Sequence, residues 1–284
     1  MSISKKYILI TGASSGIGRA CTEYLAHKGF KIYAGARKKD DIEALNELKN
    51  VTGLKIEVTD DQTIKEAFNY IKNENTGLFA IINNAGITIA GPLMDISTND
   101  LINQFNVNLI GVHRITTTFF PLLLESKGRI IMISSNSGFF AAPFFGPYCS
   151  SKFALEGYSD ALRRELLLYD VKVIIIQPGR IKTPIWDKGE KLLFKFKGSI
   201  FEKEAYEIGK YAIEKGKNES LDPSQVAKVI LTSLTIKNPK NRYMIVPDKF
   251  RNQMLKIMPA KRIDKIIKKE LTKIKFNKEH KEKR

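Results

Sequence analysis

Short apolar runs alternate with segments of helical periodicity along most of the chain. The runs are rich in Ile, Leu and Val and predict buried strands at 7–10, 31–36, 54–58, 78–82, 129–134, 172–177 and 242–246. Apolar residues three or four apart fill the intervals and predict helices, the longest at 98–124, 148–170 and 223–234. Because strands and helices alternate, we expect an α/β fold: a single-domain, Rossmann-type, doubly wound parallel sheet with helices on both faces.

The rhythm breaks in the last third of the chain. Residues 185–220 mix aromatic side chains with lysines and predict a mobile substrate lid, and residues 249–284 form a basic amphipathic extension. An apolar stripe marks the extension: Ile263, Ile266, Ile267, Leu271 and Ile274. We therefore predict a Rossmann-fold domain over 1–248, with the lid inside it, and a separate extension over 249–284.

Composition narrows the class of protein. The 284 residues are 43% hydrophobic, which is enough for one core, and two cysteines cannot form a disulfide framework. The three histidines show no ligand spacing, so we expect no metal. The first apolar run, Tyr7–Ile10, is too short for a signal sequence or a membrane span, and we expect a cytoplasmic protein.

Basic charge is concentrated at the carboxyl end. The net charge is +17, and residues 247–284 hold 14 Lys or Arg against 5 Asp or Glu, a net +9. No zinc, homeodomain or RNP motif accompanies this charge and few aromatic residues interleave it, so we expect a solvated face and no nucleic-acid partner. The stripe in the extension leaves two alternatives open: it packs on the protein's own core or a twin subunit, or it contacts an anionic membrane peripherally.

A glycine-rich turn follows the first predicted strand directly. It runs from Thr11 through Ser14 and Ser15 to Ile17 and ends at Gly18, where helical periodicity begins. Gly12 allows the tight turn, Gly16 lets a pyrophosphate approach the backbone, and Gly18 lets the helix pack closely on the strand. An ordinary strand-to-helix turn is the alternative, but the position after the first strand favours a dinucleotide site.

Arg37 follows the second predicted strand, where an adenosine ribose is expected. NAD-preferring sites place Asp or Glu there, whereas a cation accommodates a 2′-phosphate, so we expect NADP, with NAD as the alternative cofactor. Arg37 as a solvated loop charge is the competing interpretation, with Lys38 and Lys39 equally placed to contribute.

Small polar residues end the fourth predicted strand, and one amide interrupts an apolar helix face. The sequence Asn83-Asn84-Ala85-Gly86 supplies amide and backbone groups at the edge of the sheet where a cofactor binds. Asn108 lies on the apolar stripe of the predicted helix 98–124. A buried asparagine needs partners, so it is either a satisfied core amide or part of a polar network that reaches the site.

The stretch from Ser135 to Lys152 carries the candidate chemistry. Pro147 suits the first turn of a helix, so Tyr148 and Lys152 fall four apart on one face. A neighbouring ammonium favours the phenolate and makes tyrosine a usable general acid or base near working pH. Ser135 ends a buried strand, so its hydroxyl is expected to meet the phenol.

These motifs together resemble the short-chain dehydrogenase/reductase family over residues 5 to 185, and Tyr148–Gly157 is similar to its hydroxysteroid and retinol dehydrogenase branch. The resemblance implies that Tyr148 exchanges the proton with the substrate oxygen, Lys152 holds the nicotinamide ribose, and Ser135 binds the reacting oxygen. It implies that Asn108 supports a water-mediated proton relay. Further cofactor contacts implied are Glu57, where the family more often has Asp, then Val58, Asn84, Ala85, Gly86, Pro178, Gly179, Ile181 and Thr183.

The expected protein is therefore an NAD(P)-dependent oxidoreductase that interconverts a hydroxyl and a carbonyl group. The aromatic segment between Ser135 and Tyr148 predicts an apolar substrate, resembling a steroid, a retinoid or a lipid. A homodimer or homotetramer is expected. The alternative is a catalytically silent NADP(H)-binding sensor or scaffold of the same fold.

Overall fold

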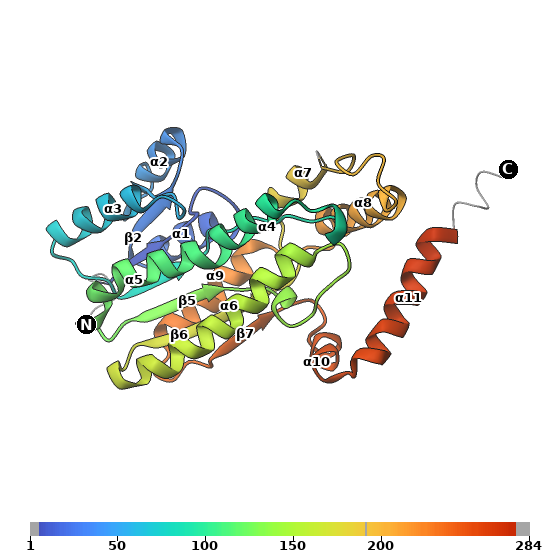
Figure 1. Ribbon diagram of the computed structural model, residues 1–284. Coiled ribbons are helices and arrows are strands. Elements are labelled where there is room, and N and C mark those ends of the chain that lie inside the picture. The colour runs from blue at the N-terminus through green and yellow to red at the C-terminus, as the bar shows by residue number, and fades with distance from the viewer. Residues whose placement is uncertain (1–5, 191, 277–284) are drawn as a thin grey trace.

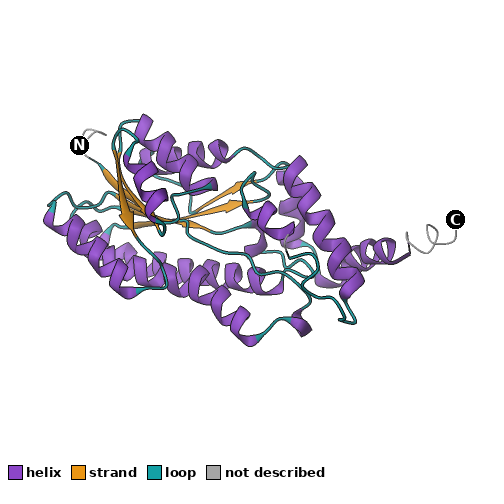
Figure 2. Cartoon of the chain, turned by 90° about the horizontal axis from the view of Figure 1, so that it is seen from above, coloured by secondary structure: helices purple, strands orange, loops and turns teal. Residues whose placement is uncertain are grey.

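The computed structural model describes residues 6–190 and 192–276. Their central element is a sheet of seven parallel strands in the order β3-β2-β1-β4-β5-β6-β7, flanked by helices on both faces (Figures 1 and 2). The strands are β1 Tyr7–Ile10, β2 Lys31–Ala36, β3 Val51–Lys55, β4 Ala80–Asn83, β5 Arg129–Ile133, β6 Lys172–Pro178 and β7 Arg242–Ile245. The predicted doubly wound α/β fold is confirmed.

Alternation along the strands divides the core into two layers. Ile8 and Ile10 of β1 face a cluster that includes α1 (Gly16–His27), α9 (Pro223–Thr235) and the short α2 (Lys39–Asn46). Leu9, between them, faces the other cluster, formed with α3 (Asp61–Asn73), α5 (Gly111–Leu124) and α6 (Gly146–Glu165). Apolar residues on both faces of a strand are what a parallel sheet covered on both sides requires.

The predicted helix 98–124 is present, but one of its turns is π-helical instead of α-helical. It consists of α4 (Thr98–Phe105), a π-helical turn η3 (Asn106–Ile110) and α5. By length and hydropathy this is the one described helical run apolar enough to cross a membrane. Its apolar residues have another explanation, because Ile115, Phe119 and Leu123 are fully buried against the sheet.

Several boundaries differ from those predicted. Strand β3 begins three residues earlier than expected and ends at Lys55, because Val58 lies after the strand, in the turn before α3. Helix α6 ends at Glu165 and continues as a 3-10 turn, Leu166–Tyr169, before Asp170 adopts a left-handed conformation. Helix α2 was not predicted, since five of its eight residues are charged or polar and few are buried.

Apart from α9, the helices of the last third of the chain lie beyond the sheet's carboxyl edge (Figure 1). Within the predicted lid lie α7 (Ile185–Glu190) and α8 (Glu202–Asn218), followed after β7 by α10 (Lys249–Ile257) and α11 (Ala260–Phe276). Helix α11 contacts α8, and its Ile263, Ile267 and Leu271 are partly buried. Three residues of the predicted stripe therefore pack within the chain, while Ile266 is 49% exposed. The side chain of Ile274 and residues 277–284 lie outside the described residues.

Candidate active site

The glycine-rich turn joins β1 to α1 in the geometry that a phosphate cradle needs. Gly12 and Gly16 have φ of 64° and 56°, in the left-handed region that favours glycine. A Cβ on Gly18 would lie 2.1 Å from the Gly12 carbonyl oxygen, so only glycine allows α1 to approach the strand this closely. Ser15 caps α1 without a side-chain hydrogen bond, and no acidic residue lies in the first turn. The helix N-terminus can therefore receive an anion.

A hydrogen-bonded clasp joins this turn to the end of β4. Thr11 Oγ1 accepts hydrogen bonds from the backbone amides of Asn84 (3.0 Å) and Ala85 (3.1 Å). Asn84 Nδ2 donates to the carbonyls of Thr11 (2.9 Å) and Gly12 (3.1 Å). The structure thus places Asn84 and Ala85 beside the glycine turn, as predicted, while Asn83 turns away toward Thr116 (3.0 Å). We did not predict the role of Thr11; its position between the strand and the first glycine was the available signal.

Asn108 sits in the π-helical turn and holds the segment after Gly86. Its Oδ1 accepts from the Ile87 amide (2.9 Å), and its Nδ2 donates to the Ile87 carbonyl (3.0 Å) and to Ser151 Oγ (3.1 Å). Ser151 belongs to α6, so this buried amide connects three elements around the site. The Asn108 side chain is a satisfied core amide, as in the first of the two interpretations. Through Ser151 it also contacts α6, the helix that carries Tyr148. π-Helical turns occur frequently at functional sites.

Tyr148, Lys152 and Ser135 converge at the carboxyl end of β5. Pro147 lies in the first turn of α6, as predicted, and Lys152 Nζ lies 5.8 Å from the centroid of the Tyr148 ring. The same ammonium donates to the carbonyl oxygen of Ile133 at 2.8 Å. Ser135 is buried, caps the turn Asn136–Gly138 by accepting from the Ser137 amide (3.1 Å), and hydrogen-bonds Tyr148.

Burial dominates the acid–base properties of this group. Desolvation lowers the pKa of Lys152 to about 8, opposed by the nearby Glu156 carboxylate. Burial also raises the pKa of Tyr148, opposed by its hydrogen bond to Ser135. The net shift of the Tyr148 pKa in the protein alone is therefore opposite to the predicted lowering, because desolvation is its largest cause.

A polar network, not predicted from the sequence, lies one helical turn beyond Lys152. The Glu156 side chain is 12% exposed and accepts from Arg242 Nε at 3.0 Å and from Gln177 Nε2 at 2.9 Å. Lys256, from α10, donates to Gln177 Oε1 at 3.3 Å and lies 4.2 Å from the centroid of the Phe139 ring. The Tyr-x-x-x-Lys-x-x-x-Glu spacing was the signal that could have found Glu156.

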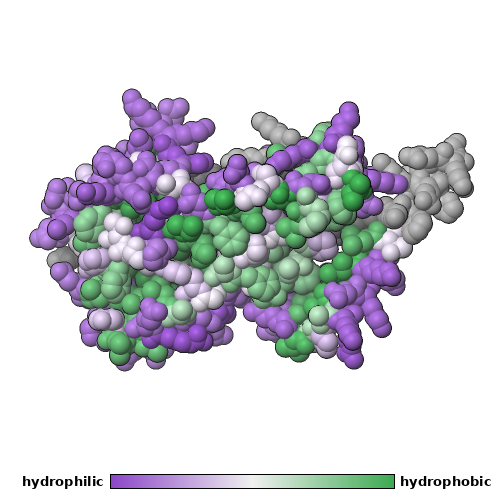
Figure 3. Space-filling model, in the orientation of Figure 1, coloured by the Kyte–Doolittle hydropathy of each residue, from purple (hydrophilic) through white to green (hydrophobic). Residues whose placement is uncertain are grey.

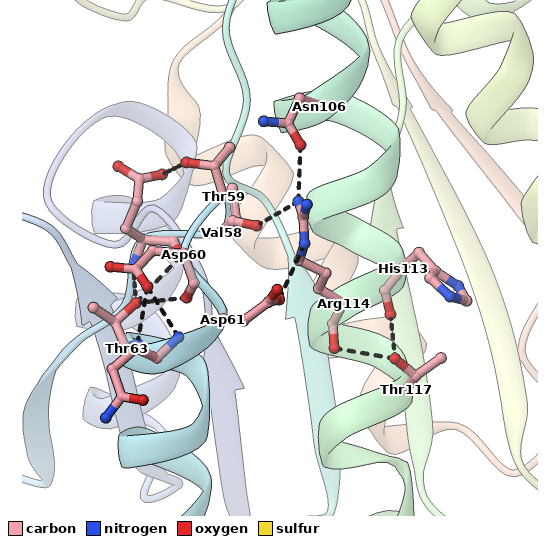
Figure 4. Close-up of polar contacts among 11 residues, drawn as sticks. Val58, Thr59, Asp60, Asp61, Thr63, Asn106, His113, Arg114 and Thr117 are labelled. Carbon is pink, nitrogen blue, oxygen red and sulfur yellow. Dashed lines mark hydrogen bonds and ion pairs between the residues drawn. The ribbon is translucent and has the colours of Figure 1, made fainter.

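At the other end of the sheet's carboxyl edge, Arg37 and Glu57 form an ion pair. Arg37 Nη1 lies 3.3 Å from Glu57 Oε2, and the Arg37 side chain is 65% exposed. Figure 4 shows how the next segment is fixed: Arg114 of α5 pairs with Asp61 (3.1 Å) and reaches the Val58 carbonyl. Val58 is buried against Gly111. The predicted adenosine end of the site is therefore clamped to the helix that carries Asn108.

The segment after β6 closes over the glycine turn. The Thr183 methyl occupies the space beside Gly16, where an added Cβ would lie 2.9 Å from it. Gly179 donates its amide to the Ile245 carbonyl (2.9 Å), and Pro178 ends the strand. The Ile181 side chain is buried, and its carbonyl accepts from Trp186 Nε1 at 2.8 Å. The structure brings Thr183 beside the glycine turn; the contact implied at Ile181 is one through the backbone, and it stays a prediction.

Residues of the predicted lid contact the loops around the site. The Phe196 ring lies against Gly91, Lys195 pairs with Asp100 at 2.8 Å, and the rings of Phe144 and Phe201 are 6.4 Å apart. Phe194, by contrast, is 71% exposed. The aromatic residues predicted around the substrate thus divide between this contact region and the surface.

The residues present fit a dinucleotide: glycines leave room for the backbone to approach phosphates, and the amino end of α1 faces them. Among the described residues, no group of three or more His, Cys, Asp or Glu is arranged to hold a metal. Fold and site together define a dinucleotide-binding protein of the Rossmann class.

Comparison with known proteins identifies the family. The short chain dehydrogenase family matches residues 6–191. The chain is 36% identical over 279 residues to a 3-amino-tetrahydro-pyrrolizinone reductase of Xenorhabdus hominickii, covering 92% of this chain and 94% of the relative. It is 34% identical to an NADPH-dependent 3-dehydrocapnine reductase of Ornithobacterium rhinotracheale, covering 95% and 98%. A short-chain dehydrogenase structure from Streptomyces avermitilis aligns with a TM-score of 0.75 at 25% identity, covering 96% and 97%. The chain belongs to the short-chain dehydrogenase family and is an NAD(P)-dependent oxidoreductase.

Proposed function

We propose that this oxidoreductase uses NADP(H) to interconvert a hydroxyl and a carbonyl group on an apolar substrate, with Tyr148 as general acid and base. One observation carries the proposal: the phenol of Tyr148, the ammonium of Lys152 and the hydroxyl of Ser135 meet at the carboxyl end of β5. Open α/β sheets bind ligands at this edge.

Each side chain has a stated task in carbonyl reduction. The bound nicotinamide supplies the hydride to the carbonyl carbon. Tyr148 donates its phenolic proton to the carbonyl oxygen, so that the product is an alcohol, and Ser135 donates a hydrogen bond to the same oxygen. Lys152 holds the ribose hydroxyls and stabilises the phenolate, and Asn108 supports return of the proton through water. Alcohol oxidation runs the same steps in reverse.

The cofactor preference rests on charge at the end of β2. Arg37 is mostly exposed and directed by Glu57, so its guanidinium can meet a 2′-phosphate. Glu57 is also proposed to contact the adenine. The reductase of Ornithobacterium rhinotracheale is named as NADPH-dependent, which supports the same preference here.

The substrate is proposed to be apolar and of medium to large size. Phe139 follows the Ser135 turn, Phe144 contacts Phe201, and Phe196 covers Gly91, so aromatic rings border the approach to Tyr148. Apolar walls with a few placed polar groups are typical of small-molecule sites.

Cytoplasmic location and a homodimer or homotetramer are further proposals. Apolar side chains exposed on α4, η3 and α6 support self-association: Ile102, Ile110 and Phe153 are 59%, 43% and 45% exposed. Mass photometry of the purified chain measures the oligomer directly.

A turnover screen tests the activity. Purified protein is assayed with NADPH and NADH against steroid-like, retinoid-like and long-chain carbonyls, and against small charged keto acids. We expect higher kcat/KM for the apolar set. Tight NADPH binding without turnover of any substrate would favour the silent sensor, and a preference for charged keto acids would overturn the apolar assignment.

A further inference from the structure

Helix α10 exposes an apolar stripe to solvent. Phe250, Met254 and Ile257 are 74%, 40% and 75% exposed, and their spacing of four and three residues puts them on one face. The helix has no buried residue. In Figure 3 hydrophobic surface appears in the area of α10, bordered by hydrophilic side chains. Contiguous exposed apolar side chains of this kind mark an interaction surface.

The opposite side of α10 is attached to the protein. Lys256 donates to Gln177 and lies over the Phe139 ring, and Asp248 caps the helix by accepting from the Arg251 amide at 2.8 Å. Phe139 follows the Ser135 turn directly. The stripe therefore has a defined direction, outward from the loop that borders the candidate active site.

Charge selects the kind of partner. Residues 249–273 contain nine Lys or Arg and two acidic residues, Asp264 and Glu270, a net charge of +7. Lys249 and Arg251 are exposed beside the stripe. A second copy docking through the same face would bring these like charges together, whereas an anionic lipid surface complements both the charge and the apolar stripe.

We propose that the face formed by Phe250, Met254 and Ile257, with Lys249 and Arg251 beside it, docks on an anionic membrane. The membrane contact that the sequence left open for the extension is thereby assigned to α10, since most of the described stripe of α11 packs toward α8 and Ile266 is its exposed member. Docking places the Phe139 loop next to the bilayer. This rests on the proposed function, because an apolar substrate partitions into the bilayer and enters the site from there.

Vesicle sedimentation of the full chain tests the proposal. Vesicles of phosphatidylcholine alone are compared with vesicles containing about one third phosphatidylglycerol. We expect binding to the anionic vesicles that weakens with salt, and at least about a tenfold loss of binding in the double variant Phe250→Ser and Ile257→Ser. Leu168→Ser is the matched control, since Leu168 is 86% exposed on the turn after α6 and should leave binding unchanged.

Binding and turnover are measured separately. NADPH binding and reduction of a water-soluble test carbonyl should be equal in wild type and the double variant. A variant that loses only vesicle binding would then show that the substitutions in α10 affect membrane docking and not the active site. Absence of turnover in both would leave the vesicle result standing and overturn the proposed function. The membrane proposal would be overturned if the wild type did not bind anionic vesicles or if the double variant bound them equally well. It would also be overturned if neither protein bound vesicles and the double variant had a smaller particle mass, since the stripe would then be a subunit interface.

Discussion

The two ends of the chain stabilise their positions around the site in different ways. Around the glycine turn, buried backbone and side-chain groups satisfy one another over short distances, as in the clasp between Thr11 and Asn84. The lid and extension are held by exposed ion pairs such as Lys195 with Asp100, and by a few contacts such as Lys256 with Gln177. Exposed pairs contribute little to stability, about 0–1 kcal/mol each. The cofactor side is therefore expected to be rigid and the substrate side adjustable.

The largest effect is expected at the junction of the two regions. Tyr148→Phe removes the proton donor but keeps the ring, so turnover should fall by a factor of at least about 10² to 10⁴ while NADPH affinity stays near that of wild type. Steady-state kinetics and fluorescence titration with NADPH measure the two quantities. Near-normal kcat would contradict the assignment of Tyr148.

The next largest effect is expected from a single methyl group added on the cofactor side. In Gly18→Ala the new Cβ meets the Gly12 carbonyl, so the turn must shift and NADPH affinity should fall by at least about tenfold. Gly157→Ala is the control, because a Cβ there meets nothing within 4 Å in helix α6 and should stabilise the fold by up to about 1 kcal/mol. Calorimetry measures both variants, and equal NADPH affinity in Gly18→Ala would remove the cradle assignment.

Glu156→Gln tests the network that joins the regions. Glu156 opposes the desolvation that lowers the pKa of Lys152 to about 8, so its loss should lower that pKa further. Lys152 then loses its charge at lower pH, and the alkaline limb of kcat/KM for carbonyl reduction should move down by about one unit. Glu165→Gln, at the exposed end of the same helix, should leave the pH profile unchanged. An unmoved profile in Glu156→Gln would limit Glu156 to a structural role.

Arg37→Asp tests the exposed part of the cofactor side. The loss of a charge-assisted hydrogen bond, worth about 1 to 3 kcal/mol, should erode or reverse the preference for NADPH over NADH. Lys38→Asp serves as the comparison, since it tests whether the neighbouring lysine shares the role. Better kcat/KM with NADH in wild type would make Arg37 a solvated loop charge.

The smallest effect is expected in the lid. Lys195→Met removes the ion pair whose hydrogen bond lowers the pKa of Asp100. A carboxyl group whose pKa is lowered in the folded state stabilises the fold at pH values above its unfolded pKa. This stabilisation is lost as the pH falls through the folded-state pKa, so the stability of the variant should depend less on pH on the acid side. At neutral pH the free energy of unfolding should change by less than about 1 kcal/mol. A larger loss, seen by urea unfolding, would make the lid as tightly held as the cofactor side.

The same contrast explains what the sequence could predict. The sequence could predict where residues lie when their position depends on local geometry. This holds for the glycines of the turn, for Arg37 at the end of a strand, and for Tyr148 and Lys152 on one face of a helix. Ion pairs such as Arg242 with Glu156 join positions far apart in the chain. The spacing from Tyr148 could have pointed to Glu156, but no neighbouring residue identifies Arg242 as its partner. The pKa of Tyr148 was misjudged for a related reason: how strongly a phenol is desolvated depends on the packing of the whole site.

The order of strands has a consequence for synthesis on the ribosome. Strand β1 lies between β2 and β4, and Ile8 pairs with Ala80, so its second neighbour is made only after α3. If β1, β2 and β3 pair before then, the edge of β1 that later receives β4 has no partner. Nascent chains that end before β4 should therefore be recognised by chaperones or proteases, and protection should begin once Asn83 has left the exit tunnel.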